Sequence, residues 1–218
     1  MNWFILAVIS AVFSAAAAVS QKKVLFKLEG IDFSFLVSIV SLILCIPFFI
    51  TMDYGSLQGI NLFILFLKTI PGTAAFLFVM LSIKNMEISK ALPLLALTPG
   101  FVAIFAFLIL GDMLTPLQSS GIVLLFIGTY LIETKSGQSI LDPFRSFFMS
   151  GAYRFVIAAL LLFTITSIAD RYLLGRYKLM PSQFMAFQQL FFSVNFLAAL
   201  FLFKKNPVVV VRSVDRKI

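Results

Sequence analysis

The stretch Lys90–Ile132 reads KALPLLALTPGFVAIFAFLILGDMLTPLQSSGIVLLFIGTYLI, and it decides the class of fold. It contains two apolar runs, each near the roughly 20 residues that a helix needs to cross the hydrocarbon core of a bilayer. Only the short turn Gly111–Pro116 separates the two runs. Two crossings joined by so short a turn must pack as an antiparallel pair. The stretch therefore predicts a polytopic membrane protein.

The composition of the whole chain agrees with this prediction. Of its 218 residues, 61% are hydrophobic and 12% are charged, whereas a soluble domain is about half apolar and a quarter charged. The net charge of +8 comes mostly from Lys and Arg in short segments between apolar runs, as membrane loops require. We therefore expect a lipid bilayer, and no nucleic acid, as the surrounding partner.

The chain lacks the residue types on which most catalytic and metal sites depend. It has no histidine, the usual general base and the commonest metal ligand. The apolar runs contain no acidic pair and no nucleophile motif. The single cysteine, Cys45, lies inside an apolar run and allows no internal disulfide. We predict that the protein is not an enzyme and has no metal site and no cofactor.

Apolar segments of transmembrane length recur along the chain, and we expect each to be a helix because lipid leaves no other partner for backbone N–H and C=O groups. The predicted spans are Trp3–Ser20, Phe33–Met52, Leu62–Ile83, Ile88–Leu110, Pro116–Ile132, Phe147–Ala169 and Pro181–Phe203. The predicted fold class is therefore all-α, a polytopic transmembrane helix bundle.

The longest hydrophilic stretch, Glu133–Arg145, divides five helices from the rest. After it the pattern restarts, because Ala18–Leu25 and Ser167–Leu174 correspond at a constant offset along the chain. We predict a first five-helix repeat at 1–133, a linker at 134–146 and a partial second repeat of two helices at 147–218. An odd number of helices inverts the second repeat in the membrane, which is a recurrent transporter architecture.

The fourth and fifth spans carry a pattern that resembles the EamA-type transporters of the drug/metabolite transporter superfamily. The matching residues are Ala91, Pro93, Leu97-Thr98-Pro99, Gly111-Asp112, Thr115, Gln118, Gly121 and Gly128, with Asp112 in place of the usual Glu. Lys68 matches a basic position common in that family. The resemblance implies ten helices in two inverted five-helix repeats, so the chain is expected to be truncated after the seventh helix; a fragment and a short form both stay open.

The orientation in the membrane has two competing interpretations. Lys and Arg gather in the odd-numbered loops of the first repeat, which places the N-terminus outside by the positive-inside rule. The resemblance instead implies that both termini are cytoplasmic. It also implies that the proton-coupled drug antiport of the related small multidrug-resistance proteins is absent, because the first span has no acidic residue.

Two prolines are expected inside helices, where proline removes a hydrogen bond and bends the chain. Pro71 lies in the third span and Pro99 in the fourth, each followed by glycine. Carbonyl groups freed by a bend need partners or must face a water-filled cavity. We predict that Pro71 and Pro99 line a substrate path; bends that serve packing alone are the alternative.

Polar side chains within the spans complete the predicted path. Lys68 is a candidate substrate or counter-ion contact, or a side chain that extends to the interface. Gln188 and Asn195 share one face of the last span and either contact substrate or bind neighbouring helices. Ser10 and Ser14 lie on small-residue stripes that serve either helix packing or the path. Asp170 and Arg171 are expected to form an interfacial pair.

The leading hypothesis for function is a secondary transporter of small metabolites, with amino acids or related solutes as candidates, that works by alternating access. We expect an integral, multi-pass protein of the bacterial cytoplasmic membrane with a small-molecule substrate. A lipid-carrier flippase, or an accessory subunit without transport activity, is the alternative. A homodimer that supplies the missing helices also stays open.

Overall fold

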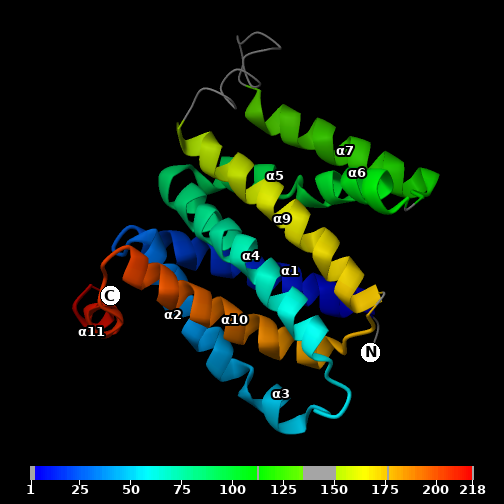
Figure 1. The fold of residues 1–218 in the computed structure, drawn as a ribbon. Helices are drawn as coiled ribbons and strands as arrows, with labels where there is room; N and C mark the ends of the chain where they lie inside the picture. Colours follow the sequence, from blue (N-terminus) through cyan, green and yellow to red (C-terminus); the bar gives the residue numbers. More distant parts are fainter. Residues whose placement is uncertain (1–2, 112, 135–150, 176, 218) are drawn as a thin grey trace.

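The computed structural model describes residues 3–111, 113–134, 151–175 and 177–217. These residues form helices and no strand, which confirms the predicted helical bundle (Figure 1). The helices are α1 Trp3–Leu25, α2 Gly30–Leu44, α3 Ile46–Thr51, α4 Gly59–Asn85, α5 Ile88–Leu95, α6 Thr98–Leu110, α7 Pro116–Glu133, α9 Gly151–Gly175, α10 Pro181–Leu202 and α11 Pro207–Lys217. The predicted linker and the predicted start of the sixth span at Phe147 lie largely outside the described residues.

Six segments of the described chain are long and apolar enough to cross a membrane, and each overlaps a predicted span. They are Phe4–Leu25, Gly30–Thr51, Gly59–Asn85, Ile88–Ile109, Tyr153–Gly175 and Pro181–Leu202. Pro116–Ile132, the remaining predicted span, is a shorter apolar helix. The protein is therefore an integral, multi-pass membrane protein.

Helix α4 lies at the centre of the bundle and contacts α1, α2, α5, α9 and α10. Its most extensive contact is with α9, which runs alongside it in Figure 1, and α10 packs between α2 and α4. Buried side chains fill these contacts: Leu65, Leu173 and Phe184 join α4, α9 and α10. The helices on both sides of the predicted linker thus share one core.

Two predicted spans are each made of two helices. Phe33–Met52 is divided at Cys45 between α2 and α3, and Ile88–Leu110 is divided at residues 96–97 between α5 and α6. In both cases a proline, Pro47 or Pro99, stands in the first turn of the second helix. Proline has no N–H to continue the preceding helix but fits a first turn, where that donor is unused.

The first span extends beyond its predicted end at Ser20, to Leu25. The extension includes Lys22, which contacts the end of α4. The Lys22 ammonium donates hydrogen bonds to the carbonyl oxygens of Ile83, Lys84 and Met86 at 2.5, 3.0 and 2.7 Å. These carbonyls end α4, where the helix dipole favours a cation. The contact fixes the end of α1 to the end of α4.

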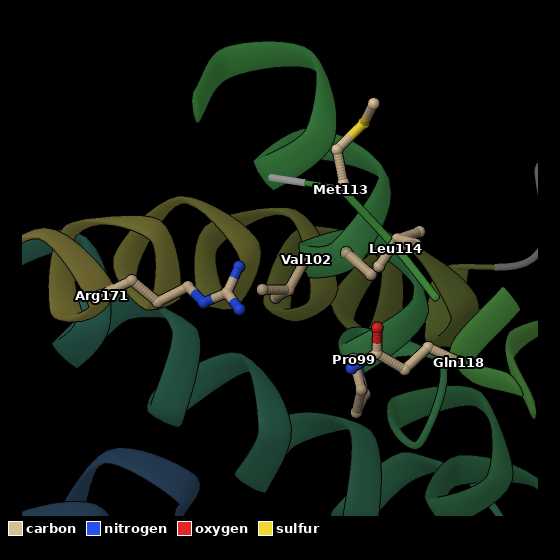
Figure 2. A pocket seen from close by; sticks show the side chains of 7 residues that line it. Pro99, Val102, Met113, Leu114, Gln118 and Arg171 are labelled. Atoms are coloured by element: carbon tan, nitrogen blue, oxygen red, sulfur yellow. The ribbon is translucent and has the colours of Figure 1, made fainter. Parts of the chain in front are cut away.

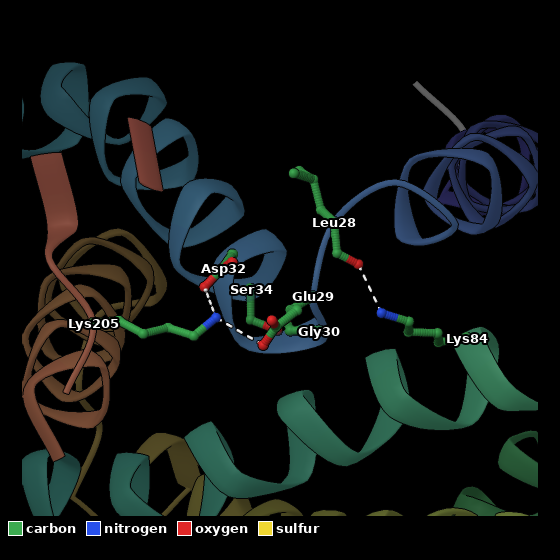
Figure 3. A network of polar contacts seen from close by, with 7 residues as sticks. All are labelled: Leu28, Glu29, Gly30, Asp32, Ser34, Lys84 and Lys205. Atoms are coloured by element: carbon green, nitrogen blue, oxygen red, sulfur yellow. Dashed lines mark hydrogen bonds and ion pairs between the residues drawn. The ribbon is translucent and has the colours of Figure 1, made fainter. Parts of the chain in front are cut away.

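A second cationic contact joins the end of α10 to the start of α2 (Figure 3). Lys205 Nζ lies 2.6 Å from Asp32 Oδ1 and 2.8 Å from Glu29 Oε2. Burial lowers the pKa of Lys205, but the hydrogen bonds and charges of Asp32 and Glu29 outweigh it, so its pKa is raised above the ordinary 10.5. In the same figure Lys84 donates to Leu28 O at 2.9 Å on the other side of the turn.

Replacing Lys205 by Met is expected to lower the free energy of unfolding by about 1 kcal/mol, the range of a partly exposed ion pair. Because the folded pKa is raised, the stabilisation is fully present below pH 10.5 and is lost as pH rises through the raised value. Thermal unfolding in detergent at neutral pH and above pH 10.5 measures both effects. Lys204→Met, at the adjacent exposed lysine, is the control; equal losses from the two variants would contradict the assignment.

Candidate functional site

A charge pair that is mostly buried, with the Asp170 side chain 30% exposed, lies where α4, α9 and α10 meet. Lys68 of α4 has a side chain only 6% exposed, and its ammonium forms a short ion pair with Asp170 of α9. The same ammonium donates to Gln188 Oε1 of α10 at 2.5 Å and lies 4.6 Å from the centre of the Phe184 ring. One cation of α4 therefore contacts a carboxylate of α9 and an amide and an aromatic face of α10.

Asp170 is the residue of this cluster that sequence reasoning assigned differently. It was expected to form an interfacial pair with Arg171, but its partner is Lys68, 102 positions earlier in the chain. Helix α9 continues to Gly175 and so places Asp170 inside the helix rather than beyond its end. The available signal was two opposite charges within apolar segments, since such charges pair with one another when buried.

A second polar contact lies along the same seam, the contact of α4 with α9 and α10, two turns beyond Gln188 on α10. Asn195 of α10 donates through Nδ2 to Thr69 Oγ1 of α4 at 3.0 Å, and Thr69 is fully buried. Ser193 donates to Ser38 O of α2 at 3.0 Å. The sequence prediction that Gln188 and Asn195 belong together is consistent with this placement, because both bind residues of α4 next to one another. Whether they also contact a substrate stays a prediction.

The break between α5 and α6 has its own hydrogen bonds. Pro99 has no N–H to bond to Leu95 O, and the Thr98 hydroxyl donates to that oxygen at 2.6 Å instead. Leu97 N bonds to Leu94 O, and the carbonyl of Pro93 accepts a 3.4 Å bond from Thr129 Oγ1 of α7. The freed carbonyls thus have hydroxyl partners, as a chain interrupted in lipid requires.

The turn between α6 and α7 is explained by two local devices. Gly111 has φ +71°, a left-handed conformation that glycine adopts without a clash, and it ends α6. Thr115 and Gln118 form a capping box: Thr115 Oγ1 accepts from Gln118 N at 3.3 Å, and Gln118 Oε1 accepts from Thr115 N at 2.9 Å. The motif that carried the family resemblance is therefore a helix stop followed by a helix start.

A cavity of about 440 Å³ lies between this turn, the start of α6 and α9 (Figure 2). Its lining residues are Pro99, Val102, Ala103, Met113, Leu114, Gln118 and Arg171. An adjoining cavity of about 370 Å³ shares Pro99, Gln118 and Arg171 and extends toward α7. Figure 2 shows the Arg171 guanidinium directed toward Val102, across the cavity from Gln118. Pro99 and Arg171 therefore line a cavity. Asp170, which directly precedes Arg171 on α9, instead takes part in the charge pair.

Of the remaining predicted path residues, Ser10 and Ser14 lie apart from these contacts, and Pro71 lies one turn from Lys68 on α4. Ser10 and Ser14 are exposed on α1, together with most of the apolar side chains of that helix. Pro71 lies inside α4, which continues unbroken through it, and Gly72 beside it faces Phe192 and Thr166. The structure therefore brings Lys68, Gln188 and Asn195 into one seam and leaves Ser10 and Ser14 on an outer surface.

Comparison with known proteins places the chain in a family. Residues 1–134 match the model of the EamA-like transporter family. No curated protein and no solved structure matches the chain. The family match covers more than half of the chain. Together with the apolar spans, it shows that the chain belongs to the EamA-like transporter family, membrane transporters of the drug/metabolite type.

Proposed function

We propose that the chain is a secondary transporter that moves small metabolites, such as amino acids or related solutes, across a cytoplasmic membrane by alternating access. The observation that carries this proposal is the buried pair of Lys68 and Asp170. It joins a helix inside the family match to a helix beyond it. Charged side chains within membrane spans are rare, and they commonly mark substrate or ion pathways.

The pair gives the bundle an interaction that a substrate can replace. Lys68 contacts Asp170 and Gln188 at the same time. A polar substrate group that reaches the seam competes with these partners for the ammonium and so weakens the contact of α4 with α9 and α10. A ligand shifts a conformational equilibrium only through different affinities for the two states, and such competition supplies the difference.

The places at which the helices can bend support the same mechanism. Pro71 interrupts the hydrogen bonding of α4 next to the charge pair, and α5 and α6 meet at the break before Pro99. Discontinuous helices near the centre of a bundle are typical of the substrate sites of secondary transporters. A bend at either place changes which helices enclose the seam while the rest of each helix stays rigid.

The proposal is tested by solute counterflow with the purified chain in proteoliposomes. Vesicles preloaded with an unlabelled amino-acid mixture are expected to accumulate external labelled amino acids, while vesicles without protein do not. A fluorescent-lipid translocation assay is run on the same vesicles. Lipid movement without solute exchange would contradict the proposal and favour a flippase, and the absence of both activities would favour an accessory subunit.

Replacing Pro99 by Ala is expected to reduce counterflow by about tenfold or more, because the restored N–H lets α5 and α6 approach a continuous helix. Membrane abundance is expected to change little, since both freed carbonyls already have hydroxyl partners. Counterflow at equal protein amounts is the measurement. Pro47→Ala is the matched control, because Pro47 also opens a helix after a break but lines neither of the two cavities beside Pro99. Equal activity of Pro99→Ala and wild type would show that transport does not depend on the break between α5 and α6.

A further inference from the structure

We infer that two adjoining cavities along α2 bind a small neutral amphiphile, an alkyl chain that ends in a hydroxyl or a primary amide. The inference goes beyond the proposed transport and does not depend on it. The two cavities share Val37 and Ser41 of α2. One of them, called here the polar pocket, takes the polar end of the ligand. The other, the apolar groove, takes the alkyl chain.

The polar pocket has a volume of about 80 Å³ and lies where α2, α4 and α10 meet, with α2 and α10 side by side in Figure 1. Besides Val37, its lining consists of three polar side chains and three aromatic rings: Ser38, Ser41, Gln189, Phe76, Phe192 and Phe196. One water molecule needs roughly 10–15 Å³ of such space. The pocket therefore accommodates a polar group larger than one water.

Two of the polar side chains in this pocket have hydrogen-bonding groups to offer. The Ser38 hydroxyl donates to Phe35 O at 2.7 Å. For the Ser41 hydroxyl and the Gln189 amide, by contrast, no hydrogen bond is found within the described chain. Both side chains are partly exposed, so a small molecule in the pocket can reach them.

The depth of these two side chains in the membrane makes a partner valuable. Ser41 lies near the middle of the span Gly30–Thr51, and Gln189 lies near the middle of the span Pro181–Leu202. Lipid tails offer neither donors nor acceptors at that depth, and a polar group without a partner there is costly. A ligand that bonds to Ser41 and Gln189 removes this cost.

The apolar groove supplies the space for the rest of the ligand. Its volume is about 360 Å³, in the range of small-molecule sites. Ser41 is its one polar residue among those described, and the others are Val24, Leu28, Phe33, Leu36, Val37 and Val40. Because the groove and the polar pocket adjoin at Val37 and Ser41, a molecule with one polar end and one apolar end occupies both.

In a membrane the polar end of such a ligand decides whether it binds. The alkyl chain leaves lipid tails for a groove that is equally apolar, so it gains little from the transfer. The hydroxyl or amide gains hydrogen bonds to Ser41 and Gln189 that lipid tails do not offer. An alkane of the same length is therefore expected to show no preference for the groove over lipid.

The lining also decides the charge of the polar end. None of the described residues that line either cavity is charged. A carboxylate or an ammonium would lose its hydration there without gaining an opposite charge. The hydroxyl of Ser41 and the amide of Gln189 each donate and accept hydrogen bonds. They match an uncharged group that does both, which is the property of an alcohol and of a primary amide.

The test is photolabelling of the purified chain in phosphatidylcholine vesicles by octanol that carries an aliphatic diazirine, with the labelled residues identified by mass spectrometry. The label is expected on α2 and α10 at residues that line the two cavities. An excess of unlabelled octanol or octanamide is expected to remove most of it, whereas octane, octanoate and octylammonium are not. Equal competition by octane would show that the groove accepts any alkyl chain, and equal competition by octylammonium or octanoate would contradict an uncharged ligand. Either result overturns the inference.

Two variants assign the polar contacts. Gln189→Leu is expected to reduce the labelling that octanol displaces by about tenfold, the effect of one lost hydrogen bond, and Ser41→Ala is expected to reduce it severalfold. The thermal unfolding midpoint of Gln189→Leu without ligand is expected to equal or exceed that of wild type, because an amide without a partner is replaced by an apolar group. A purely structural role of the amide predicts a lower midpoint.

Ser34→Ala is the matched control. Ser34 is also a serine of α2, but it lines neither cavity and its hydroxyl donates to Gly30 O at 2.7 Å. Its labelling is expected to equal that of wild type. Labelling of Gln189→Leu at the wild-type level would overturn the inference, as would wild-type protein without label on α2 or α10, since water would then be the partner of Ser41 and Gln189.

Discussion

Lys68→Met is expected to lower the free energy of unfolding by about 3 kcal/mol or more, because removing one partner of a buried pair leaves the other charge uncompensated. The charge left behind is that of Asp170. The Lys68 ammonium linked Asp170 to Gln188, and the substitution removes this link. Asp170→Asn is expected to have a similar effect from the other side. Unfolding in mixed detergent micelles, followed by circular dichroism, measures both losses.

The double variant Lys68→Met, Asp170→Leu separates stability from function. Removing both charges of a buried pair is commonly neutral or stabilising, so the double variant is expected to recover most of the lost stability. Counterflow is expected to stay near the background, because the Lys68 ammonium, for which the substrate competes, is absent. Lys90→Met is the control, since Lys90 forms an exposed pair with Glu87. A double variant that transports at the wild-type rate would show that the pair has a structural role alone.

Gly72→Val is expected to lower the free energy of unfolding by about 1–3 kcal/mol, the usual cost of overpacking. A Cβ atom at Gly72 would lie 3.1 Å from two ring atoms of Phe192 and 3.7 Å from Thr166 Cγ2. The glycine thus allows α4, α9 and α10 to approach at a single point beside Pro71. The same unfolding measurement applies, and counterflow is expected to fall with it because the charge pair is one turn away.

Two further variants give that prediction its controls. Phe192→Leu is expected to restore part of the stability of Gly72→Val, because a shorter side chain leaves room for the added methyl groups. Gly128→Ala on α7 is expected to be harmless or slightly stabilising, because an added Cβ there meets no atom within 4 Å. If Gly128→Ala destabilised the protein as much as Gly72→Val, the close approach at Gly72 would not be the cause.

Hydropathy predicted the spans because a membrane imposes a length and an apolar composition on every helix that crosses it. Hydropathy does not reveal where a helix is interrupted, since the residues around Cys45 and residues 96–97 are as apolar as the helices that they separate. Pro47 and Pro99 were the only local signs, and a proline inside a helix and one in a first turn look alike in sequence. The structure of α2–α3 and α5–α6 therefore could not be derived from composition.

The candidate site was partly predictable for a related reason. Lys68, Gln188 and Asn195 stand out because polar side chains are costly in lipid. Asp170 was misassigned because its contact with Lys68 depends on how two helices are rotated about their axes, which a nearly uniform apolar sequence does not specify. The lining of the Arg171 cavity likewise depends on the approach of α6, α7 and α9.

The break at residues 96–97 has a consequence for the energy of the bundle in lipid. Thr98 and Thr129 satisfy the carbonyls of Leu95 and Pro93, and one of these hydroxyls belongs to the break itself. The interruption therefore needs no water to exist in the hydrocarbon layer. A helix that is interrupted in this way keeps its interruption in a dry bundle. The break at residues 96–97 therefore persists whether the neighbouring cavity contains water or not.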